Sequence, residues 1–273
     1  MTTPTHPSEP LGKPAADFLA RTAVVIPALN EEPCIAATVH EWHGRGVALV
    51  RVADNGSTDA TAARAHAAGA EVVREVRRGY GAAAWAGTRG LPANIEWILF
   101  SSADGSDRLD EATAAAFQHE IERGALLILG ERVTRPESRR RLTPTQRFGN
   151  ALCCALIALG WGRRFHDMAA LRVVRRDAFE RLALRDRGFG WNVEMQVRAV
   201  EHGLRIAEVP VDFHARIAGE SKISGNLAGI VRAGWGILAM VTRLRAERAR
   251  RQRADALPRG IKRRPRPLTG CQP

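Results

Sequence analysis

Short runs of apolar residues alternate with longer, helix-like segments through the first half of the chain. The apolar runs are rich in β-branched residues and predict buried strands at residues 23–27, 49–53, 71–76, 97–100 and 125–130. The segments between them predict helices at residues 31–44, 58–68, 79–90 and 110–123. This alternation predicts an α/β fold, in which a Rossmann-like, mostly parallel sheet carries helices on both faces.

The second half of the chain is less regular. Residues 151–161 predict an apolar helix, and residues 170–174 and 206–211 predict strands on either side of a helix at 191–202. A further apolar segment, 227–244, runs into a basic C-terminal region. The apolar segments fit either core helices or helices that lie in a membrane interface. A spanning helix needs about 20 consecutive apolar residues, and no segment provides them.

Positive charge is concentrated at the C-terminus. The net charge is +12, and the residues from Arg243 onward hold eleven lysines and arginines against two acids, or +9 of that surplus. We predict a disordered leader at residues 1–21, one folded domain at 22–242 and a basic, disordered tail at 243–273. Such a tail attracts an anionic membrane surface, although a solvated tail without a partner has the same composition.

The composition also excludes several classes of protein. The four cysteines form no C-x-x-C pair, which argues against a structural zinc site and a disulfide framework and indicates a reducing, cytoplasmic compartment. The leader has no apolar run that would form a signal peptide. The tail lacks interleaved aromatic residues and no nucleic-acid-binding motif occurs, so we expect no nucleic-acid partner.

Carboxylates and amides follow three of the predicted strands at the point where each strand ends. These polar turns lie at residues 27–32, 54–59 and 102–107. Parallel strands bring their carboxyl ends to one edge of the sheet, where ligands of such folds bind. Acidic side chains there can accept hydrogen bonds from a ribose or hold a divalent cation against a diphosphate. The same residue types also form ordinary turns, which is the alternative interpretation.

Four short motifs occur in a fixed order along the chain. They are Val24–Glu32 (VVIPALNEE), Val52–Asp59 (VADNGSTD), Gly79–Ala83 (GYGAA) and Ser102–Gly105 (SADG). Together they resemble family 2 glycosyltransferases of the GT-A fold, and within that family most of all the dolichyl- or polyprenyl-phosphate sugar synthases. The likeness covers roughly residues 22–240. It implies that the folded domain is a GT-A domain.

The resemblance implies a nucleotide pocket built from the first two polar turns. Its lining residues would be Pro27, Asn30, Glu31, Asp54 and Asn55. Asn55 stands where the family has an aspartate, which removes one negative charge near the base.

The resemblance also implies a divalent cation, Mg²⁺ or Mn²⁺, that Asp104 would hold against the diphosphate of the donor. Ser102 stands where the family carries the first aspartate of its D-x-D motif, so one carboxylate ligand is missing. We expect Asp107, in the following turn, to act as a second metal ligand.

Cations in the second half of the chain indicate an acceptor that carries a phosphate. The resemblance implies that Arg132, Arg147 and Lys222 are catalytic together with Asp104, and Arg and Lys can bind a phosphate through charge-assisted hydrogen bonds. Residues 216–222 resemble the family's R-x-x-G-x-S-K element. The predicted activity is transfer of a hexose from a GDP- or UDP-sugar to a polyprenyl-phosphate-type lipid, by a cytoplasmic enzyme that lies peripherally at the inner face of the membrane.

The nature of the acceptor decides whether the reaction needs a general base. The alternative acceptor is a sugar or a phosphorylated small molecule, and its hydroxyl group would need a base. Asp167 and Glu194 are the two candidates. A lipid phosphate is already ionised, with a second pKa of about 6, and needs positioning more than a base. The sequence leaves this choice open.

Overall fold

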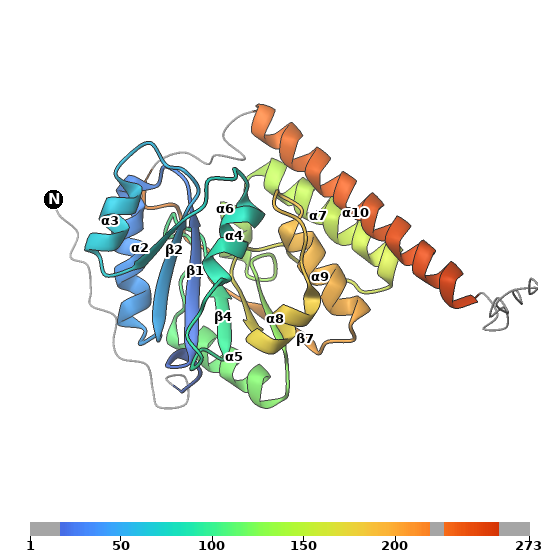
Figure 1. Ribbon diagram of the computed structural model, residues 1–273, viewed down its shortest axis with the longest axis horizontal. Coiled ribbons are helices and arrows are strands. Elements are labelled where there is room, and N and C mark those ends of the chain that lie inside the picture. Colours follow the sequence, from blue (N-terminus) through green and yellow to red (C-terminus); the bar gives the residue numbers. More distant parts are fainter. Residues whose placement is uncertain (1–16, 219–226, 257–273) are drawn as a thin grey trace, which may run out of the picture.

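Seven strands form one sheet at the centre of the described part of the protein (Figure 1). The structure is a computed structural model that describes residues 17–218 and 227–256. The strand order is β3-β2-β1-β4-β6-β5-β7. The strands are β1 (Thr22–Ala28), β2 (Leu49–Asp54), β3 (Glu71–Arg74), β4 (Trp97–Phe100), β5 (Leu127–Glu131), β6 (Arg172–Arg175) and β7 (Ile206–Pro210).

All but one of these strands run in the same direction. β1 pairs in parallel with β2 and β4, β2 pairs with β3, and β5 pairs with β7. The exception is β6, which is antiparallel to both of its neighbours, β4 and β5. The prediction of a mostly parallel α/β sheet is confirmed, and each predicted strand occurs within a few residues of its expected position.

Helices cover both faces of the sheet. They are α2 (Glu32–Gly44), α3 (Thr61–Ala67), α4 (Tyr80–Thr88), α5 (Glu111–Glu122), α6 (Pro136–Arg141), α7 (Pro144–Trp161), α8 (Arg176–Leu182), α9 (Trp191–Glu201) and α10 (Leu227–Ala256). One core cluster packs α2, α3 and α5 against the sheet, and a second packs α4, α7, α8, α9 and α10 against it. The two clusters lie on opposite faces because successive strand side chains alternate: Val24 belongs to the first and Val25 to the second.

The folded domain begins earlier than predicted. Residues 17–19 are helical, and Phe18 and Leu19 are fully buried in the core. Thr22 donates its hydroxyl hydrogen bond to Phe18 O at 2.7 Å, which joins this turn to β1. The end of the predicted leader is therefore part of the domain. A single apolar pair among polar residues has no periodicity, so the sequence pattern did not reveal it.

The predicted disordered tail is also wrong up to Ala256, because helix α10 continues to that residue. Leu244 is fully buried, and Glu247 forms an ion pair with Arg198 of α9. The high density of arginines suggested a solvated tail, yet one stripe of this segment is apolar and faces the core. None of the helices in the described ranges is long and apolar enough to cross a membrane.

Candidate active site

The turn after β1 is bound directly to the turn after β2. The register pairs Ala28 with Asp54, so the two strands end level with each other. Asn30 has a left-handed backbone, with φ 52°, and its Oδ1 accepts a hydrogen bond from Thr58 N at 2.8 Å. The backbone N of Asn30 donates to Ser57 Oγ at 2.9 Å. The structure therefore brings the first two polar turns together at one edge of the sheet.

Asp54 carries a buried carboxylate oxygen that lacks a hydrogen bond. Its Oδ1 accepts from Ser57 N at 3.1 Å. Its Oδ2 lies 4.0 Å from Arg74 Nε and has no hydrogen-bond partner among the described residues. Buried acceptors are normally satisfied, because an unpaired one costs about 1–3 kcal/mol. Oδ2 is therefore an acceptor with spare capacity at the predicted nucleotide pocket.

The Asn55 side chain shapes the next turn of the pocket. Its Nδ2 donates to Glu75 O at 3.1 Å and to Arg77 O at 2.7 Å, and its Oδ1 accepts from Gly79 N at 2.8 Å. Gly79 has φ +144°, and a Cβ atom there would lie 2.1 Å from Arg187 O, which only glycine tolerates. These bonds leave one lone pair of Oδ1. The predicted contact between Asn55 and the nucleotide would use that lone pair.

Arg216 joins the ends of β1 and β4. Its Nη1 donates to Asp104 Oδ2 at 2.8 Å, and its Nη2 donates to both carboxylate oxygens of Glu31 at 2.9 and 3.0 Å. The other oxygen of Asp104 accepts from Ser106 N at 3.0 Å. Two of the acids predicted from the sequence therefore meet at one guanidinium group. Pro27, the remaining pocket residue, is half-buried near the end of β1.

Asp107 closes its own turn. It is 4% exposed, and its Oδ2 accepts from Ser102 N at 2.7 Å. Burial raises the pKa of the Asp107 carboxyl above its ordinary value. Within the described residues no group of three or more His, Cys, Asp or Glu side chains is arranged to hold a metal ion. The role of Asp107 as a second metal ligand stays a prediction.

The meeting of Glu31 and Asp104 fits a divalent cation better than Asp107 does. Both carboxylates already contact a single positive group from two sides. Mg²⁺ in phosphate-handling sites is held by one or two carboxylates, and substrate phosphates and waters complete its octahedron. Mn²⁺ accepts the same oxygen ligands. These two acids are therefore suited to hold the cation once a diphosphate supplies the remaining ligands.

Arg132 and Asp167 form a buried pair beside this edge. Arg132 Nε and Nη2 donate to the two oxygens of Asp167 at 2.7 and 2.9 Å, and its backbone N donates to the same group at 2.8 Å. The Asp167 side chain is fully buried. Burial opposes the charge on Arg132, but the hydrogen bonds to Asp167 raise its pKa overall. Asp167 is thus bound to Arg132 and has no free oxygen facing a substrate.

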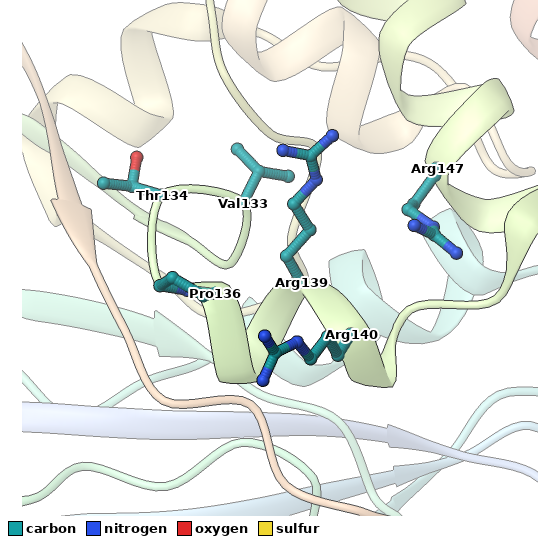
Figure 2. A pocket seen from close by; sticks show the side chains of 6 residues that line it. All are labelled: Val133, Thr134, Pro136, Arg139, Arg140 and Arg147. Carbon is teal, nitrogen blue, oxygen red and sulfur yellow. The ribbon is translucent and has the colours of Figure 1, made fainter.

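Three arginines line a cavity of about 270 Å³ after β5 (Figure 2). The cavity is lined by Val133, Thr134, Pro136, Arg139, Arg140 and Arg147. The arginines are exposed, and none forms an ion pair with an acid in the described part of the chain. Unpaired guanidinium groups around a hollow favour a phosphate, which they can bind in a bidentate manner. We call this cavity the arginine pocket.

The arginine pocket is connected to the edge where Asp104 lies. Ser138 of α6 donates to Val211 O at 3.1 Å and accepts from Phe213 N at 3.0 Å. Phe213 in turn forms a β-bridge with Asp107, and its ring lies 5.0 Å from the Arg132 guanidinium. The segment after β7 therefore runs from the arginine pocket to the site of Glu31 and Asp104.

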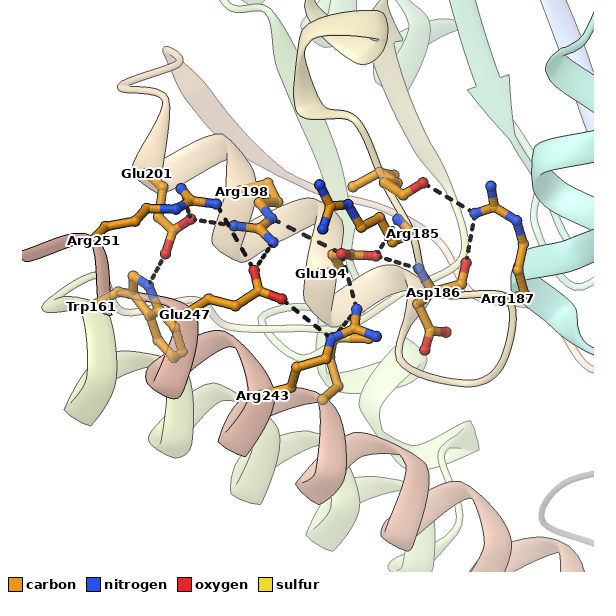
Figure 3. Close-up of polar contacts among 12 residues, drawn as sticks. Trp161, Arg185, Asp186, Arg187, Glu194, Arg198, Glu201, Arg243, Glu247 and Arg251 are labelled. Carbon is orange, nitrogen blue, oxygen red and sulfur yellow. Dashed lines mark hydrogen bonds and ion pairs between the residues drawn. The ribbon is translucent and has the colours of Figure 1, made fainter. Parts of the chain in front are cut away.

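Glu194, the other candidate base, holds a loop in place (Figure 3). It is fully buried, and its Oε2 accepts from the backbone N of Arg185 and Asp186 at 2.9 and 2.7 Å. Its Oε1 accepts from Arg243 of α10 at 3.2 Å. Both oxygens are occupied inside the protein, so Glu194 positions this loop and is not placed to take a proton from a substrate.

Arg147, which the sequence offered as a catalytic residue, lines this cavity, and its catalytic role stays a prediction. Sequence reasoning did not single out Arg139 and Arg140. The sequence signal for these two residues was the run of arginines before the apolar helix. We interpreted that run only as a basic connection. Lys222 lies outside the described residues. The bridging position of Arg216 had no local signal, because Glu31, Asp104 and Arg216 come from three distant parts of the chain.

The sheet, its helices and its polar strand ends define a GT-A fold. The sequence profile of glycosyl transferase family 2 matches residues 23–183. An uncharacterized glycosyltransferase of Mycobacterium tuberculosis (strain ATCC 25618 / H37Rv) is 37% identical over 208 residues, which cover 76% of this chain and 92% of that protein. The chain therefore belongs to glycosyl transferase family 2 and is a glycosyltransferase.

Other relatives agree with this assignment. The polyprenol monophosphomannose synthase of Mycolicibacterium smegmatis (strain ATCC 700084 / mc(2)155) is 31% identical over 248 residues, covering 82% of this chain and 90% of that protein. A crystal structure of glucosyl-3-phosphoglycerate synthase from Mycobacterium tuberculosis, in complex with Mn²⁺, UDP-glucose and phosphoglyceric acid, matches with a TM-score of 0.67. That match has 20% sequence identity and covers 85% of this chain and 82% of the other, so it supports the fold alone.

Proposed function

We propose that this glycosyltransferase transfers a hexose from a GDP- or UDP-sugar to the phosphate of a polyprenyl-phosphate-type lipid. The observation that carries this proposal is the junction of the arginine pocket with an exposed apolar stripe. Arg147 lines the pocket, and the next residue, Phe148, is 70% exposed. A phosphate joined to a long hydrocarbon chain has the two properties that such a junction recognises.

The apolar stripe runs along the outer side of α7. Phe148, Leu152 and Leu159 recur at spacings of four and seven, so they share one face of this helix. The buried side chains of α7, which include Ile157, lie on the opposite face. Contiguous exposed apolar surface can mark a binding site, and this shared face supports one on α7.

Helix α10 extends this surface. It lies beside α7 (Figure 1), and Arg245 donates to Leu156 O at 3.5 Å across the contact. Two apolar side chains of α10 are also exposed: Trp235 is 71% exposed and Leu238 is 41% exposed. Apolar side chains beside arginines suit a helix pair in a membrane interface, with the cations at the headgroups. We infer that the enzyme lies peripherally on the inner face of the membrane, where such a lipid is available.

The donor side of the reaction is assigned to the edge formed by β1, β2 and β4. Asp54 Oδ2 would accept a hydrogen bond from the nucleotide, because it has no donor among the described residues. Asp104 and Glu31 would hold Mg²⁺ or Mn²⁺. When bound there, the cation would supply neutralising charge for the diphosphate that leaves. Glucosyl-3-phosphoglycerate synthase, which shares the fold, was solved with Mn²⁺ and UDP-glucose.

The transfer itself needs no general base. An ionised oxygen of the acceptor phosphate attacks the anomeric carbon of the hexose, and the bond from that carbon to the diphosphate oxygen breaks. The nucleoside diphosphate leaves with the electron pair, and no proton changes place. This agrees with the burial of Asp167 and Glu194, since neither has an oxygen free for a substrate proton. The arginines of the pocket would orient the acceptor phosphate.

A second candidate is transfer to a phosphorylated small molecule. It is favoured by the similarity in fold to glucosyl-3-phosphoglycerate synthase, which was solved with phosphoglyceric acid. The arginine pocket alone suits either acceptor, because both carry a phosphate. The apolar stripe favours the lipid acceptor, since a small polar acceptor has no hydrocarbon chain to contact Phe148 and Leu152.

The test uses the full chain and nucleotide sugars labelled in the hexose. GDP- and UDP-sugars are offered with Mn²⁺ to a short polyprenyl phosphate in detergent, to the corresponding polyprenol and to 3-phosphoglycerate. We expect label in the organic phase with the lipid phosphate and none with the polyprenol. Label on 3-phosphoglycerate, with none on the lipid phosphate, would establish the second candidate instead.

A further inference from the structure

The segment that follows β7 lies across the ends of β1 and β4 as a strap, which we define as residues 213–218. Its backbone is bound at two points to the turn after β4: His214 N donates to Ser106 O at 3.0 Å, and Ile217 N donates to Asp104 O at 3.0 Å. Cys34 at the start of α2 donates to Ala218 O at 3.3 Å. The strap is thus fixed to the elements that carry the metal-binding acids.

The side chains of the strap fill the space above the turn after β4. Gly105 has φ +71°, and a Cβ atom there would lie 2.3 Å from Ile217 Cδ1. The Arg216 guanidinium, 25% exposed, spans the gap between Glu31 and Asp104. Its Nε is buried without a hydrogen-bond partner among the described residues. The Arg216 side chain is therefore held at its tip, by the hydrogen bonds of Nη1 and Nη2 to the two carboxylates.

We propose that Arg216 occupies the place of the divalent cation in the donor-free enzyme, so that the cation and the donor diphosphate bind together by displacing it. Asp104 Oδ2 accepts from Nη1 of Arg216, and Glu31 accepts from Nη2 of the same guanidinium group. Two positive groups cannot share these carboxylates without strong repulsion. The proposal rests on the assignment of the cation to Asp104 and Glu31 in the proposed function.

The exchange links cation binding to movement of the strap. A divalent cation that binds alone breaks the two ion pairs of Arg216 and replaces them with nothing. When a diphosphate binds with the cation, the released guanidinium gains a new anionic partner. The cation should therefore bind weakly alone and tightly with the nucleotide. The backbone bonds of Ile217 and His214 would loosen at the same time, which would open the edge of the sheet toward the arginine pocket.

The experiment measures Mn²⁺ binding without any sugar or acceptor. Calorimetry or electron paramagnetic resonance gives the Kd of Mn²⁺ alone for the wild-type protein, for Arg216→Ala and for the double variant with Asp104→Ala. Arg74→Ala is the matched control, because it removes an arginine near Asp54 that does not touch Asp104. We expect Arg216→Ala to bind Mn²⁺ about tenfold or more tightly than wild type, the scale of one charged hydrogen-bonded pair.

The control variant should bind Mn²⁺ as the wild type does, and Asp104→Ala should abolish the gain. Equal or weaker Mn²⁺ affinity in folded Arg216→Ala overturns the proposal, as does a gain that survives Asp104→Ala. In the wild type, hydrogen exchange of residues 213–218 should accelerate when Mn²⁺ is added with UDP or GDP, and unchanged exchange would also overturn it. Failure of transfer to polyprenyl phosphate would refute the proposed acceptor but would leave these binding results unaffected.

Discussion

Arg132 and Asp167 meet side by side, with Nε and Nη2 of the arginine 2.7 and 2.9 Å from the two carboxylate oxygens. The guanidinium also lies over the ring of Phe213, with Cζ 5.0 Å from the ring centre. The arginine is thus fixed from two directions. Asp167, which the sequence offered as a base, fixes the orientation of Arg132 beside the arginine pocket.

This pair gives a prediction about stability. Asp167→Ala leaves the guanidinium of Arg132 largely buried without its partner, and breaking such a pair costs about 3–5 kcal/mol. Chemical denaturation of the variant should show that loss in the free energy of unfolding. The matched control is Asp177→Ala, whose partners Arg175 and Arg181 are exposed, and there we expect a change below about 1 kcal/mol. Equal losses in both variants would contradict the argument.

Asp104 gives a prediction about the reaction. Asp104→Ala removes the carboxylate proposed to face the diphosphate, and loss of such electrostatic stabilisation lowers kcat by about 100-fold or more. The measurement is transfer at saturating Mn²⁺ and donor, with circular dichroism to verify the fold. Glu111→Gln, on the exposed first turn of α5, is the control and should retain full activity. Normal turnover by Asp104→Ala would exclude its proposed role.

The arginine pocket gives a prediction about the acceptor. Arg139→Ala and Arg140→Ala each remove one unpaired guanidinium group, and we expect the KM for the phosphate acceptor to rise about tenfold, the scale of one charged hydrogen bond. The KM for the donor should not change, because the proposed donor site lies at another part of the sheet edge. Arg123→Ala, an exposed arginine after α5, controls for the loss of surface charge. A rise in the donor KM alone would show that the arginine pocket binds the donor and not the acceptor.

The sequence predicts most of the fold because central strands such as β1, β4 and β5 are separate apolar runs that are buried on both faces. β1 is an example, since Val24 and Ile26 enter one core cluster and Ala23 and Val25 enter the other. It also predicts which turns carry the site, because the carboxyl ends of parallel strands must share one edge. Asp54 and Asp104 were expected at that edge for this reason, and their binding roles stay predictions.

Tertiary pairing, by contrast, leaves no local pattern. In the sequence, Glu194 looks like a free acid near the start of a helix. The structure shows that Oε2 accepts from the loop at 185–186 and that Oε1 accepts from Arg243. Arg216 is separated from Asp104 by more than one hundred residues along the chain. Its bridging role follows from the path of the strap, which no periodicity encodes.

The contact between α9 and α10 gives a prediction about pH. Burial opposes the charge of Glu247, but hydrogen bonds from Arg198 and the nearby charge of Arg243 lower its pKa below the ordinary value. A lowered pKa in the folded state contributes stability that is present above the unfolded pKa of about 4.3 and is lost as the pH falls through the folded pKa. Acid should therefore weaken the contact between these helices.

Urea denaturation of wild type and Glu247→Gln at several pH values tests this contribution. At pH 7 the variant should be less stable. The difference should narrow as the pH falls below about 4.3, where Glu247 of the unfolded chain begins to take up a proton while the folded form still carries its charge. Glu137→Gln, on the first turn of α6, is the control and should show no such narrowing. A difference that stays constant down to pH 3 would contradict the shifted pKa.

The last prediction concerns the membrane, and the structure decides where the chain should be cut. A truncation at Arg243 would remove Leu244, which is fully buried, and Glu247, which binds Arg198. A cut after Ala256 keeps all of α10. It still removes five of the eleven cations of the basic region, which lie in residues 257–273 together with no acid.

The full chain should sediment with vesicles that contain anionic lipid, and high salt should release most of it, since each cation near the surface contributes about 1 kcal/mol or less and is screened by salt. The version that ends at Ala256 should bind more weakly and bind nucleotide normally. Phe148→Ser and Trp235→Ser should reduce the part of the binding that survives salt, because they remove exposed apolar surface from α7 and α10. Val76→Ser is the control, because Val76 is 87% exposed outside this helix pair. If Val76→Ser lowers vesicle binding as much as Phe148→Ser does, the helix pair is not the membrane-facing surface.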